Sequence, residues 1–147
     1  MNRFISHTIN DRRFSEYIHT EISDGQKIHY HEWSMFDYSD NKIATFTVYV
    51  YDDEPETAYF SQFIVREDNR FNGFGKFVLN NLEKFIPESC NEIYLWVQKS
   101  SSKVVLSSEI LIPWYERHGF VQVPEFEEND CFWLIKHITK NHQNQTK

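Results

Sequence analysis

Residues 69–76, NRFNGFGK, contain Gly73 and Gly75, two of the four glycines in the chain, between the basic residues Arg70 and Lys76. An apolar run precedes this stretch and helical spacing of apolar residues follows it, so a strand is expected to pass into a helix here. The first turn of a helix has backbone N–H groups without intrahelical acceptors, and the helix dipole favours anions at that end. Glycine lets the backbone approach an anion closely. The stretch predicts a phosphate or pyrophosphate cradle, with a tight turn that binds nothing as the alternative.

Two other nucleotide-binding loops do not fit the sequence. It has no GxxxxGK[ST], which argues against a P-loop NTPase, and no GxGxxG with an acidic residue at the expected distance, which argues against a dinucleotide fold.

A second stretch with possible chemistry is residues 112–120, IPWYERHGF. Trp114 is expected in the core, while Tyr115 is either half of a buried aromatic pair or a reactive phenol.

The elements that position these residues follow from apolar periodicity and from β-branched and aromatic content. The expected strands are 26–33, 43–51, 58–65, 92–97, 120–123 and 131–137; one helix runs from Phe74 to just before Pro87, and a second ends at Gly119. The first three strands are joined by short turns, including one at 39–41, and should form an antiparallel meander. A strand–helix–strand unit of this length implies a parallel pair with a crossover helix. The predicted fold class is therefore α+β, with a mixed, mostly antiparallel sheet and a central parallel β-α-β unit.

The two ends of the chain are less well defined. Within residues 1–25, a short helix would place four apolar residues on one face, Phe14, Tyr17, Ile18 and Ile22. The expected order is then β-β-β-α-β-α-β-β after an ambiguous N-terminal segment. The length of 147 residues fits one domain, and the polar tail 140–147 is expected to fray.

The composition excludes several classes of protein. Aromatic residues make up 17% of the chain, which argues against disorder. The net charge of −7 and the lack of a basic run argue against nucleic-acid binding and favour a cationic partner. No apolar run is long enough to cross a bilayer, and residues 1–14 lack the core of a signal peptide. Cys90 and Cys131 have no metal-ligand spacing, so two reduced thiols in a cytoplasmic protein without a metal are expected.

The two stretches together resemble a known family. Residues 63–76, FIVREDNRFNGFGK, are similar to the acetyl-CoA loop of the GNAT-family N-acetyltransferases, in which a strand ending in Val leads through a turn to R/Q-x-x-G-x-G/A at the start of a helix. Residues 112–120 resemble a second motif of that family, a P-F-Y-E-K-x-G-F type of segment. The two motifs occur in the family's order, and the resemblance extends over about residues 43–137.

The resemblance implies direct transfer of an acetyl group from acetyl-CoA to a primary amine. It implies that the cofactor lies between the splayed strands 58–65 and 92–97, with its pyrophosphate on the amides of 71–76 and its pantetheine arm along 63–65. A backbone N–H near Val65 would polarise the thioester carbonyl, and Tyr115 takes the family position of the acid that protonates the CoA thiolate. The implied cofactor-binding residues are Phe63, Ile64, Val65, Arg70, Phe71, Asn72, Gly73, Phe74, Gly75, Lys76 and Ser108.

The sequence departs from the family at several points. The carboxylate that often acts as base on the strand before the loop is missing, and the residues there are Tyr59, Ser61 and Gln62. Glu56, His29 and His31 are further candidates that would act through water, or they belong to a solvated strand face, so the base is unassigned. Phe71 replaces a small residue, Ser108 is the nearest match to an Asn that touches pantetheine, and few residues precede the first strand. The shortened N-terminal part suggests an open groove for a bulky acceptor.

Two functional hypotheses follow. The first is an N-acetyltransferase that acts on a cationic amine, such as a peptide or protein side chain, an N-terminus or a polyamine-like small molecule. The second is a catalytically silent member of the fold that binds CoA or a partner protein. Phe132 and Trp133 on the last predicted strand are candidates for a homodimer interface.

Overall fold

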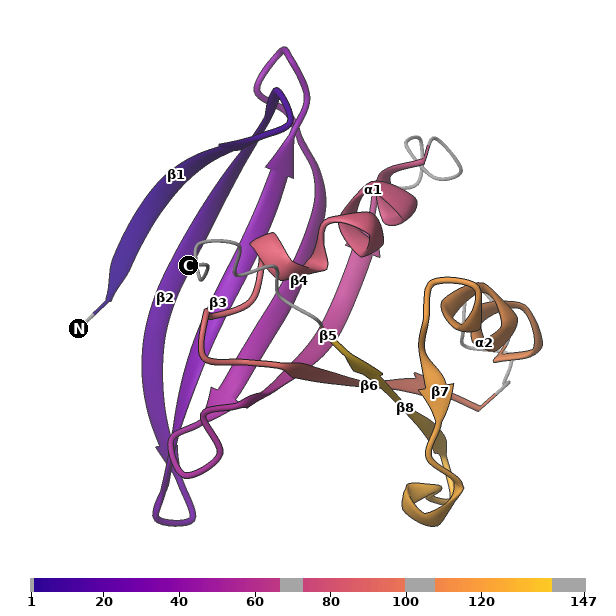
Figure 1. The fold of residues 1–147 in the computed structure, drawn as a ribbon. Coiled ribbons are helices and arrows are strands. Elements are labelled where there is room, and N and C mark those ends of the chain that lie inside the picture. Colours follow the sequence, from indigo (N-terminus) through magenta and orange to yellow (C-terminus); the bar gives the residue numbers. More distant parts are fainter. Residues whose placement is uncertain (1, 67–72, 100–107, 139–147) are drawn as a thin grey trace, which may run out of the picture.

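The computed structural model describes residues 2–66, 73–99 and 108–138, which are built around one eight-stranded sheet (Figure 1). The strands are β1 (Arg3–Ile9), β2 (Arg12–Ser23), β3 (Gln26–Phe36), β4 (Lys42–Tyr51), β5 (Thr57–Val65), β6 (Glu92–Gln98), β7 (Val121–Gln122) and β8 (Cys131–His137). The helices are α1 (Phe74–Asn80) and α2 (Ser108–Glu116), with 3₁₀ turns η2 (Leu82–Lys84) and η3 (Pro124–Phe126). The spatial order is β1-β2-β3-β4-β5-β6-β8-β7, and only β5 and β6 pair in parallel. The predicted α+β fold class is therefore confirmed.

The N-terminal segment forms strands, and the expected short helix is wrong. β1 pairs with β2 along its whole length, and β2 pairs in turn with β3. Each hairpin turn consists of two residues with positive φ, Asn10 (50°) and Asp11 (65°) in the first and Asp24 (51°) and Gly25 (77°) in the second. These are the angles of type I′ turns, which match the twist of the flanking strands. The order of elements thus begins with two strands, β1 and β2, in the segment where the apolar spacing predicted a short helix.

The apolar residues of β2 are divided between the two faces of the sheet. Phe14 is fully buried, whereas Tyr17, three residues later, points to the other face and stacks on Phe4 with ring centroids 4.5 Å apart. Ile22 is 73% exposed. A helix would have gathered these side chains on one face, but the alternation of a strand separates them.

β5 and β6 are paired only over their first halves. The register runs from Thr57 opposite Glu92 to Phe60 opposite Leu95 and ends there. Beyond this point the two strands diverge, as Figure 1 shows. On its other side, β5 contains a β-bulge, because its register with β4 shifts by one residue between Ser61 and Ile64. The expected splay of the two parallel strands is confirmed.

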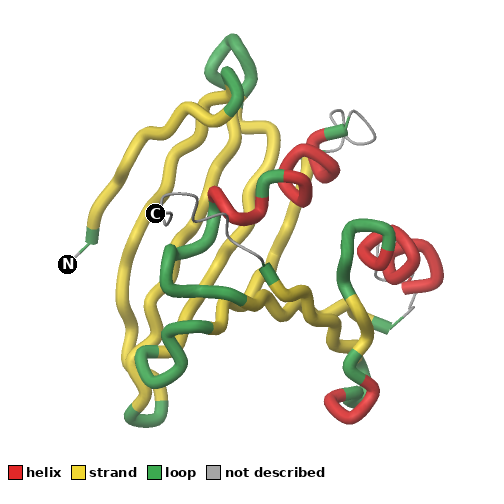
Figure 2. Tube along the Cα trace, viewed as in Figure 1, coloured by secondary structure: helices red, strands yellow, loops and turns green. Residues whose placement is uncertain are grey.

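One face of the sheet carries the aromatic core. The ring centroid of Phe85 lies 5.0 Å from that of Phe14, 5.0 Å from that of Trp33 and 5.1 Å from that of Phe46, and all four residues are buried. Phe85 directly follows η2, so these contacts fasten the α1–η2 segment onto β2, β3 and β4. Figure 2 shows this segment crossing the strands. Burial of each ring stabilises the fold by roughly 2–3 kcal/mol.

The helix expected from Phe74 to Pro87 is interrupted at Asn81. The side-chain Nδ2 of Asn81 donates to the carbonyl of Phe77 at 2.8 Å, and the residue leaves helical geometry with φ −123°. Asparagine competes with backbone hydrogen bonds in this way, which lowers its helix propensity. The segment therefore continues as the 3₁₀ turn η2 rather than as one longer helix.

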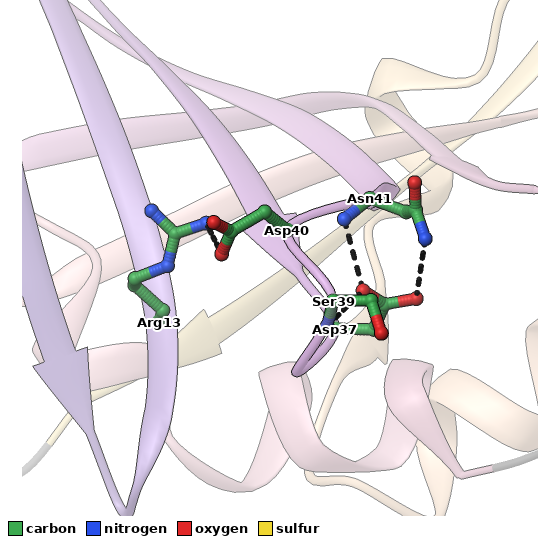
Figure 3. A network of polar contacts seen from close by, with 5 residues as sticks. All are labelled: Arg13, Asp37, Ser39, Asp40 and Asn41. Carbon is green, nitrogen blue, oxygen red and sulfur yellow. Dashed lines mark hydrogen bonds and ion pairs between the residues drawn. The ribbon is translucent and has the colours of Figure 1, made fainter.

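The turn between β3 and β4 is organised by Asp37 (Figure 3). Its Oδ1 accepts hydrogen bonds from the backbone N–H groups of Ser39 and Asn41, both at 2.9 Å. The hydrogen bond from the Asn41 backbone is the main reason that the pKa of Asp37 is lowered. Arg13 of β2 pairs with Asp40 at 2.5 Å and connects the turn to the neighbouring hairpin. The turn predicted at residues 39–41 is confirmed, and its chemistry is that of an Asx turn.

The face opposite the core carries a row of stacked tyrosines. Tyr30, Tyr49, Tyr59 and Tyr94 are consecutive cross-strand partners from β3 to β6. Their ring centroids are 5.7, 5.1 and 5.7 Å apart along the row. Aromatic pairs of this kind stabilise a sheet. We call this row the tyrosine ladder.

Glu16 is a buried carboxylate on the core face of β2. His7 Nε2–H donates to one of its oxygens at 2.8 Å, and His31 Nδ1–H donates to the other at 2.6 Å. Burial alone would raise the pKa of Glu16, but the hydrogen bonds from the two histidines outweigh burial and lower the pKa. A lowered folded-state pKa stabilises the protein above the unfolded value of about 4.3, and this contribution is lost as the pH falls through the folded value.

We therefore expect Glu16→Gln to reduce the free energy of unfolding by about 1–3 kcal/mol near neutral pH, because hydrogen bonds to a charged group are lost. The difference from wild type should shrink in acid, where Glu16 itself becomes neutral. Urea unfolding of both proteins, near neutral pH and again below the ordinary glutamate pKa, measures this. Glu32→Gln is the control, because Glu32 also pairs with a histidine, His19, but is half exposed and should cost little. An equal difference at both pH values would contradict the assignment.

Both cysteines are free, as expected from the sequence, and both are buried. Burial raises the pKa of the Cys131 thiol to about 11, and the nearby Glu128 carboxylate adds to the shift. The thiol is therefore protonated and donates to Glu128 at 3.0 Å. Among the described residues, no helix is long and apolar enough to span a membrane.

Candidate active site

A pocket of about 200 Å³ opens where β5 and β6 diverge. It is lined by Phe60, Ser61, Phe63, Leu95, Trp96, Val97, Gln98, Leu111 and Tyr115. Phe60, Leu95 and Val97 belong to the core face. Ser61 and Trp96 alternate with them and point to the opposite face. The pocket therefore passes between the two strands and reaches both faces of the sheet.

The end of β5 forms one wall of this pocket. Phe63 lines it, Ile64 is 59% exposed, and Val65 packs against the core. The N–H of Arg66 donates to the carbonyl of Ile43 in β4 at 2.8 Å. Because backbone polar groups alternate along a strand, those of Val65 are directed to the opposite edge, toward the diverging β6. The predicted residues Phe63, Ile64 and Val65 thus lie along the edge where the two strands separate.

Gly73 supplies the backbone turn at the start of α1. Its φ is +83°, and its carbonyl accepts the first helical hydrogen bond, from Phe77 N–H at 2.9 Å. A left-handed conformation is unstrained only for glycine. A Cβ placed on Gly73 would meet no atom of the described residues within 4 Å, its chain neighbours apart. None of the described residues therefore fills the space that a ligand on the first turn of α1 would need.

Gly75 is required for a different reason. A Cβ at this position would lie 3.0 Å from Cη2 and 3.2 Å from Cζ2 of Trp114, and 3.3 Å from Cε2 of Phe63. The first turn of α1 is thus pressed against the Trp114 ring of α2 and the Phe63 ring of β5. The absence of a side chain brings the predicted cradle, the end of β5 and the helix of Tyr115 together.

We expect Gly75→Val to lower the free energy of unfolding by about 1–3 kcal/mol through overpacking against Trp114. Chemical denaturation measures the change. A Gly75→Val/Trp114→Leu double variant provides the control, because the smaller leucine removes the clash. Its loss of stability should be smaller than the sum of the two single losses. Strictly additive losses would show that the two residues do not contact each other.

Tyr115 enters the pocket from the last turn of α2. Only 8% of the residue is exposed, and burial raises its pKa to about 12. The phenol is consequently protonated at any physiological pH. Its ring packs against Trp114 (centroids 5.0 Å apart) and Phe120 (5.7 Å). The side chain is thus a fixed, protonated donor group at the wall of the pocket.

The end of α2 holds Tyr115 in place through a Schellman motif. Phe120 N–H donates to the carbonyl of Tyr115 at 3.2 Å, and Gly119 N–H donates to that of Glu116 at 3.0 Å. Gly119 has φ +96°, as a C′ glycine requires. Lys136 of β8 caps the helix by donating to the carbonyl of His118 at 2.7 Å. The predicted helix end at Gly119 is confirmed.

The structure places the remaining predicted cofactor-binding residues in different environments. Phe74 packs against the core, with the Arg12 guanidinium 5.2 Å above its ring, and Lys76 is exposed on α1. Ser108 is buried as the first residue of α2. Three predicted residues, Arg70, Phe71 and Asn72, lie outside the described residues, as does the tail predicted to fray.

Sequence reasoning missed the residues that β6 and α2 contribute to the pocket. Leu95 is the last β6 residue paired with β5, and Trp96 and Val97 follow it where the strands diverge. Leu111 lies one helical turn before Tyr115. Trp96 is 44% exposed despite its size. The sequence does show that Trp96 is a large aromatic residue on a predicted strand. Its place at the pocket, however, depends on where the pairing of β5 and β6 ends, which the sequence does not show.

The structure does not bring the candidate bases together at the pocket. Ser61 lines the pocket, whereas Tyr59 lies in the tyrosine ladder and Glu56 is exposed in the turn before β5. His29 pairs with Asp52, and His31 pairs with Glu16. The side chain of Gln62 lies outside the described part of the structure. The base therefore stays unassigned.

Comparison with known proteins identifies a family model and similar folds. The model of the acetyltransferase (GNAT) family matches residues 4–120, which reaches nearer the N-terminus than the two motifs. A comparison with curated protein sequences gave no significant match.

Three solved structures illustrate the similarity in fold. A putative acyl-CoA N-acyltransferase from Klebsiella pneumoniae has a TM-score of 0.59 at 12% identity, with 75% of this chain and 73% of that chain covered. An aminoglycoside 6'-N-acetyltransferase complexed with coenzyme A has a TM-score of 0.59 at 18% identity, with 76% and 74% covered. The spermidine/spermine N-acetyltransferase SpeG from Vibrio cholerae has a TM-score of 0.57 at 20% identity, with 80% and 70% covered.

Proposed function

The chain belongs to the acetyltransferase (GNAT) family and is an acyltransferase, and we propose that it transfers an acetyl group from acetyl-CoA to a primary amine of a cationic acceptor. The observation that carries the proposal is the pocket between β5 and β6, with the strand edge at residues 63–65 on one side and Tyr115 on the other. The family uses acetyl-CoA. The proposed chemistry needs no metal ion and takes place within one domain.

The residues at the start of α1 fit the diphosphate part of the cofactor. The open space beside Gly73 permits close approach to the backbone, and the amides of the first helical turn point along the helix axis toward it. We assign this role to residues 71–76. The backbone edge of residues 63–65 is assigned to the pantetheine arm, which would lie beside it as an added strand does. Ser108, at the start of α2, is the proposed contact from the opposite wall.

The reacting end of the cofactor would lie in the pocket. Bound acetyl-CoA supplies an activated acetyl thioester. A backbone N–H of residues 63–65 would stabilise the negative charge that develops on the thioester oxygen. As the acceptor nitrogen bonds to the acetyl carbon and the C–S bond breaks, the Tyr115 hydroxyl would donate its proton to the departing thiolate. The nitrogen would release its own proton to solvent, from which the phenol, with its raised pKa, would be reprotonated.

The acceptor is proposed to be a cationic molecule with a primary amine. The chain carries a net charge of −7, which attracts cations. Two structures of similar fold belong to enzymes named for aminoglycoside and for spermidine and spermine acetylation, and these substrates are polyamines or carry several amines. A small molecule of this kind, a peptide or protein side chain and an N-terminus are all within the proposal.

The test has two steps. Calorimetric titration with acetyl-CoA should give saturable binding, and a thiol-release assay with a panel of polyamines, aminoglycosides and lysine peptides should then find acceptors. Cofactor binding without turnover for any amine would favour a catalytically silent member of the fold. The absence of cofactor binding would contradict the proposed function at its first step.

A further inference from the structure

A second, larger groove of about 660 Å³ lies on the sheet face opposite the core. It is lined by Tyr49, Tyr51, Glu54, Thr57, Tyr59, Glu92, Tyr94, Phe126, Glu128 and Trp133. Six of these ten residues are aromatic and three are glutamates, and the described residues that line the groove include no lysine or arginine. We call it the aromatic–acidic groove. The proposed acetyl transfer assigns no role to any of its side chains.

The aromatic rings of the groove stand in two orientations. Tyr59 lies nearly parallel to its ladder neighbours Tyr49 (12°) and Tyr94 (20°). Tyr51 and Trp133 stand almost perpendicular to Tyr59, at 86° and 85°, with centroids 5.5 and 6.3 Å away. The stacked tyrosines cover one another's faces, so the ring faces that remain for a ligand are those of the perpendicular Tyr51 and Trp133. A cation is attracted to the face of such a ring.

The carboxylates of the groove are held at its rim by neutral donors. Tyr59 O–H donates to Glu54 at 3.3 Å, Thr57 O–H donates to Glu92 at 2.7 Å, and Trp133 Nε1–H donates to Glu128 at 3.0 Å. Within the described residues, one ion-pair contact involves this set, between Glu92 Oε1 and His137 Nδ1 at 3.9 Å. None of the described lysines or arginines forms an ion pair with the three glutamates.

The raised pKa values of two tyrosines agree with a groove of negative potential. Burial and then the nearby Glu54 raise the pKa of Tyr59, and burial and then Glu92 raise the pKa of Tyr94. Both phenols therefore stay protonated, and the groove combines neutral aromatic rings with three glutamates. This combination favours a cation that is weakly hydrated.

We propose that the aromatic–acidic groove binds an organic ammonium group. The aromatic faces would attract the cation through cation–π interactions, and the glutamates at the rim would supply the countercharge. A small metal ion would instead need several oxygen ligands at close range. An anion would be repelled by all three glutamates.

The ammonium group has two possible sources. Tyr59 and Tyr94 are each two residues from Ser61 and Trp96 of the candidate active site, on the same face, so the groove begins roughly 7 Å along the strands from that pocket. The group would belong either to the distal, non-reacting end of a polycationic acceptor or to a separate ligand. The first source rests on the proposed function, whereas ammonium binding itself does not.

The test compares choline with its neutral isostere 3,3-dimethylbutan-1-ol. Titration of the full chain, followed by NMR or calorimetry at low salt, should give a dissociation constant for choline that is about tenfold lower than that for the alcohol. Raising the ionic strength should weaken choline binding because the glutamates at the rim are exposed to solvent. Equal binding of the two compounds, or binding of neither, would overturn the proposal.

Matched variants locate the binding. Tyr94→Leu should weaken choline binding about tenfold, whereas Tyr30→Leu, which removes a ladder ring outside the groove, should leave it unchanged. Glu54→Gln keeps the rings and tests the countercharge if Tyr94→Leu does not fold. Loss of binding in Tyr30→Leu, or its retention in both groove variants, would overturn the assignment.

Two further measurements distinguish the acceptor from a separate ligand as the source of the ammonium group, and either of them from a second copy of the chain. If the groove binds the acceptor, choline should inhibit acetyl transfer competitively with the amine; if it binds a separate ligand, choline should still bind but should not compete. Sedimentation identifies the alternative that a second copy covers the groove through Trp133. A dimer that Tyr94→Leu dissociates, together with the absence of choline binding, would replace the proposed ligand with a partner subunit.

Discussion

Replacing Tyr115 with phenylalanine is expected to lower the turnover number about 10²–10⁴-fold while leaving the dissociation constant of acetyl-CoA nearly unchanged. The substitution removes one oxygen and keeps the ring, so the contacts with Trp114 and Phe120 persist. Burial raises the pKa of Tyr115, and no hydrogen bond from the described residues adds to this shift. Deleting the hydroxyl should therefore cost the fold little. The predicted effect falls on the chemical step alone.

The pH dependence adds an independent check. Because the pKa of Tyr115 is about 12, this residue stays protonated throughout a usual assay range, and neither limb of the pH–rate profile should be due to it. The phenylalanine variant should be slower at every pH with unchanged apparent pKa values. Steady-state kinetics and calorimetry on both proteins test this, with Tyr30→Phe as the control for removal of a hydroxyl elsewhere. A variant with the wild-type rate would remove Tyr115 from the mechanism.

The strands with the strongest local signals were predicted most accurately. Residues 131–137 match β8 at both ends, and the strands predicted at 43–51 and 58–65 match β4 and β5 within one residue. Their β-branched and aromatic residues alternate on a sheet that is buried on one face, so local pattern and tertiary environment agree. The helix predicted from Phe74 was too long because a single side-chain hydrogen bond from Asn81 outweighs the apolar spacing.

The N-terminal hairpins show why apolar spacing alone was misleading. Phe14, Tyr17 and Ile18 have the spacing of a helical face by coincidence, and only the turns reveal the strands. All four residues of the turns Asn10-Asp11 and Asp24-Gly25 have positive φ. An Asp-Gly pair is among the strongest short-range signals for a hairpin, and Asn and Asp also tolerate positive φ. If the turn residues had been identified first and the apolar spacing interpreted afterwards, the predicted order of elements would have been correct.

The positions of the two candidate motifs in the fold were predictable because each motif is local in sequence. Gly73 and Tyr115 lie where their motifs placed them, at the start of α1 and in the last turns of α2. The other side of the pocket was not predictable, because Trp96 and Leu111 reach it only through the divergence of β5 and β6. That divergence depends on where the register ends, which is a tertiary property. The aromatic–acidic groove was missed for the same reason, since its residues come from separate strands.

Gly73→Val is expected to weaken acetyl-CoA binding on the order of a hundredfold. A valine side chain would enter the open space beside the first turn of α1, where the proposed diphosphate must approach the backbone, and charge-assisted hydrogen bonds there contribute about 1.5–3 kcal/mol each. Valine is also strained at a φ of +83°, which costs about 1–3 kcal/mol of folding stability. A control must separate these two effects.

Gly25 provides that control. Its φ is +77°, close to that of Gly73, and a Cβ there would also meet nothing within 4 Å, but it lies in the turn between β2 and β3. Gly25→Val should therefore lose a similar amount of stability while binding acetyl-CoA as the wild type does. Calorimetric titration and thermal unfolding of the three proteins measure both quantities. If the two variants lose affinity equally, the loss reflects strain, and the diphosphate does not lie on α1. If only Gly73→Val loses affinity, strain is excluded as the cause, and the glycine serves to leave room for the cofactor at the start of α1.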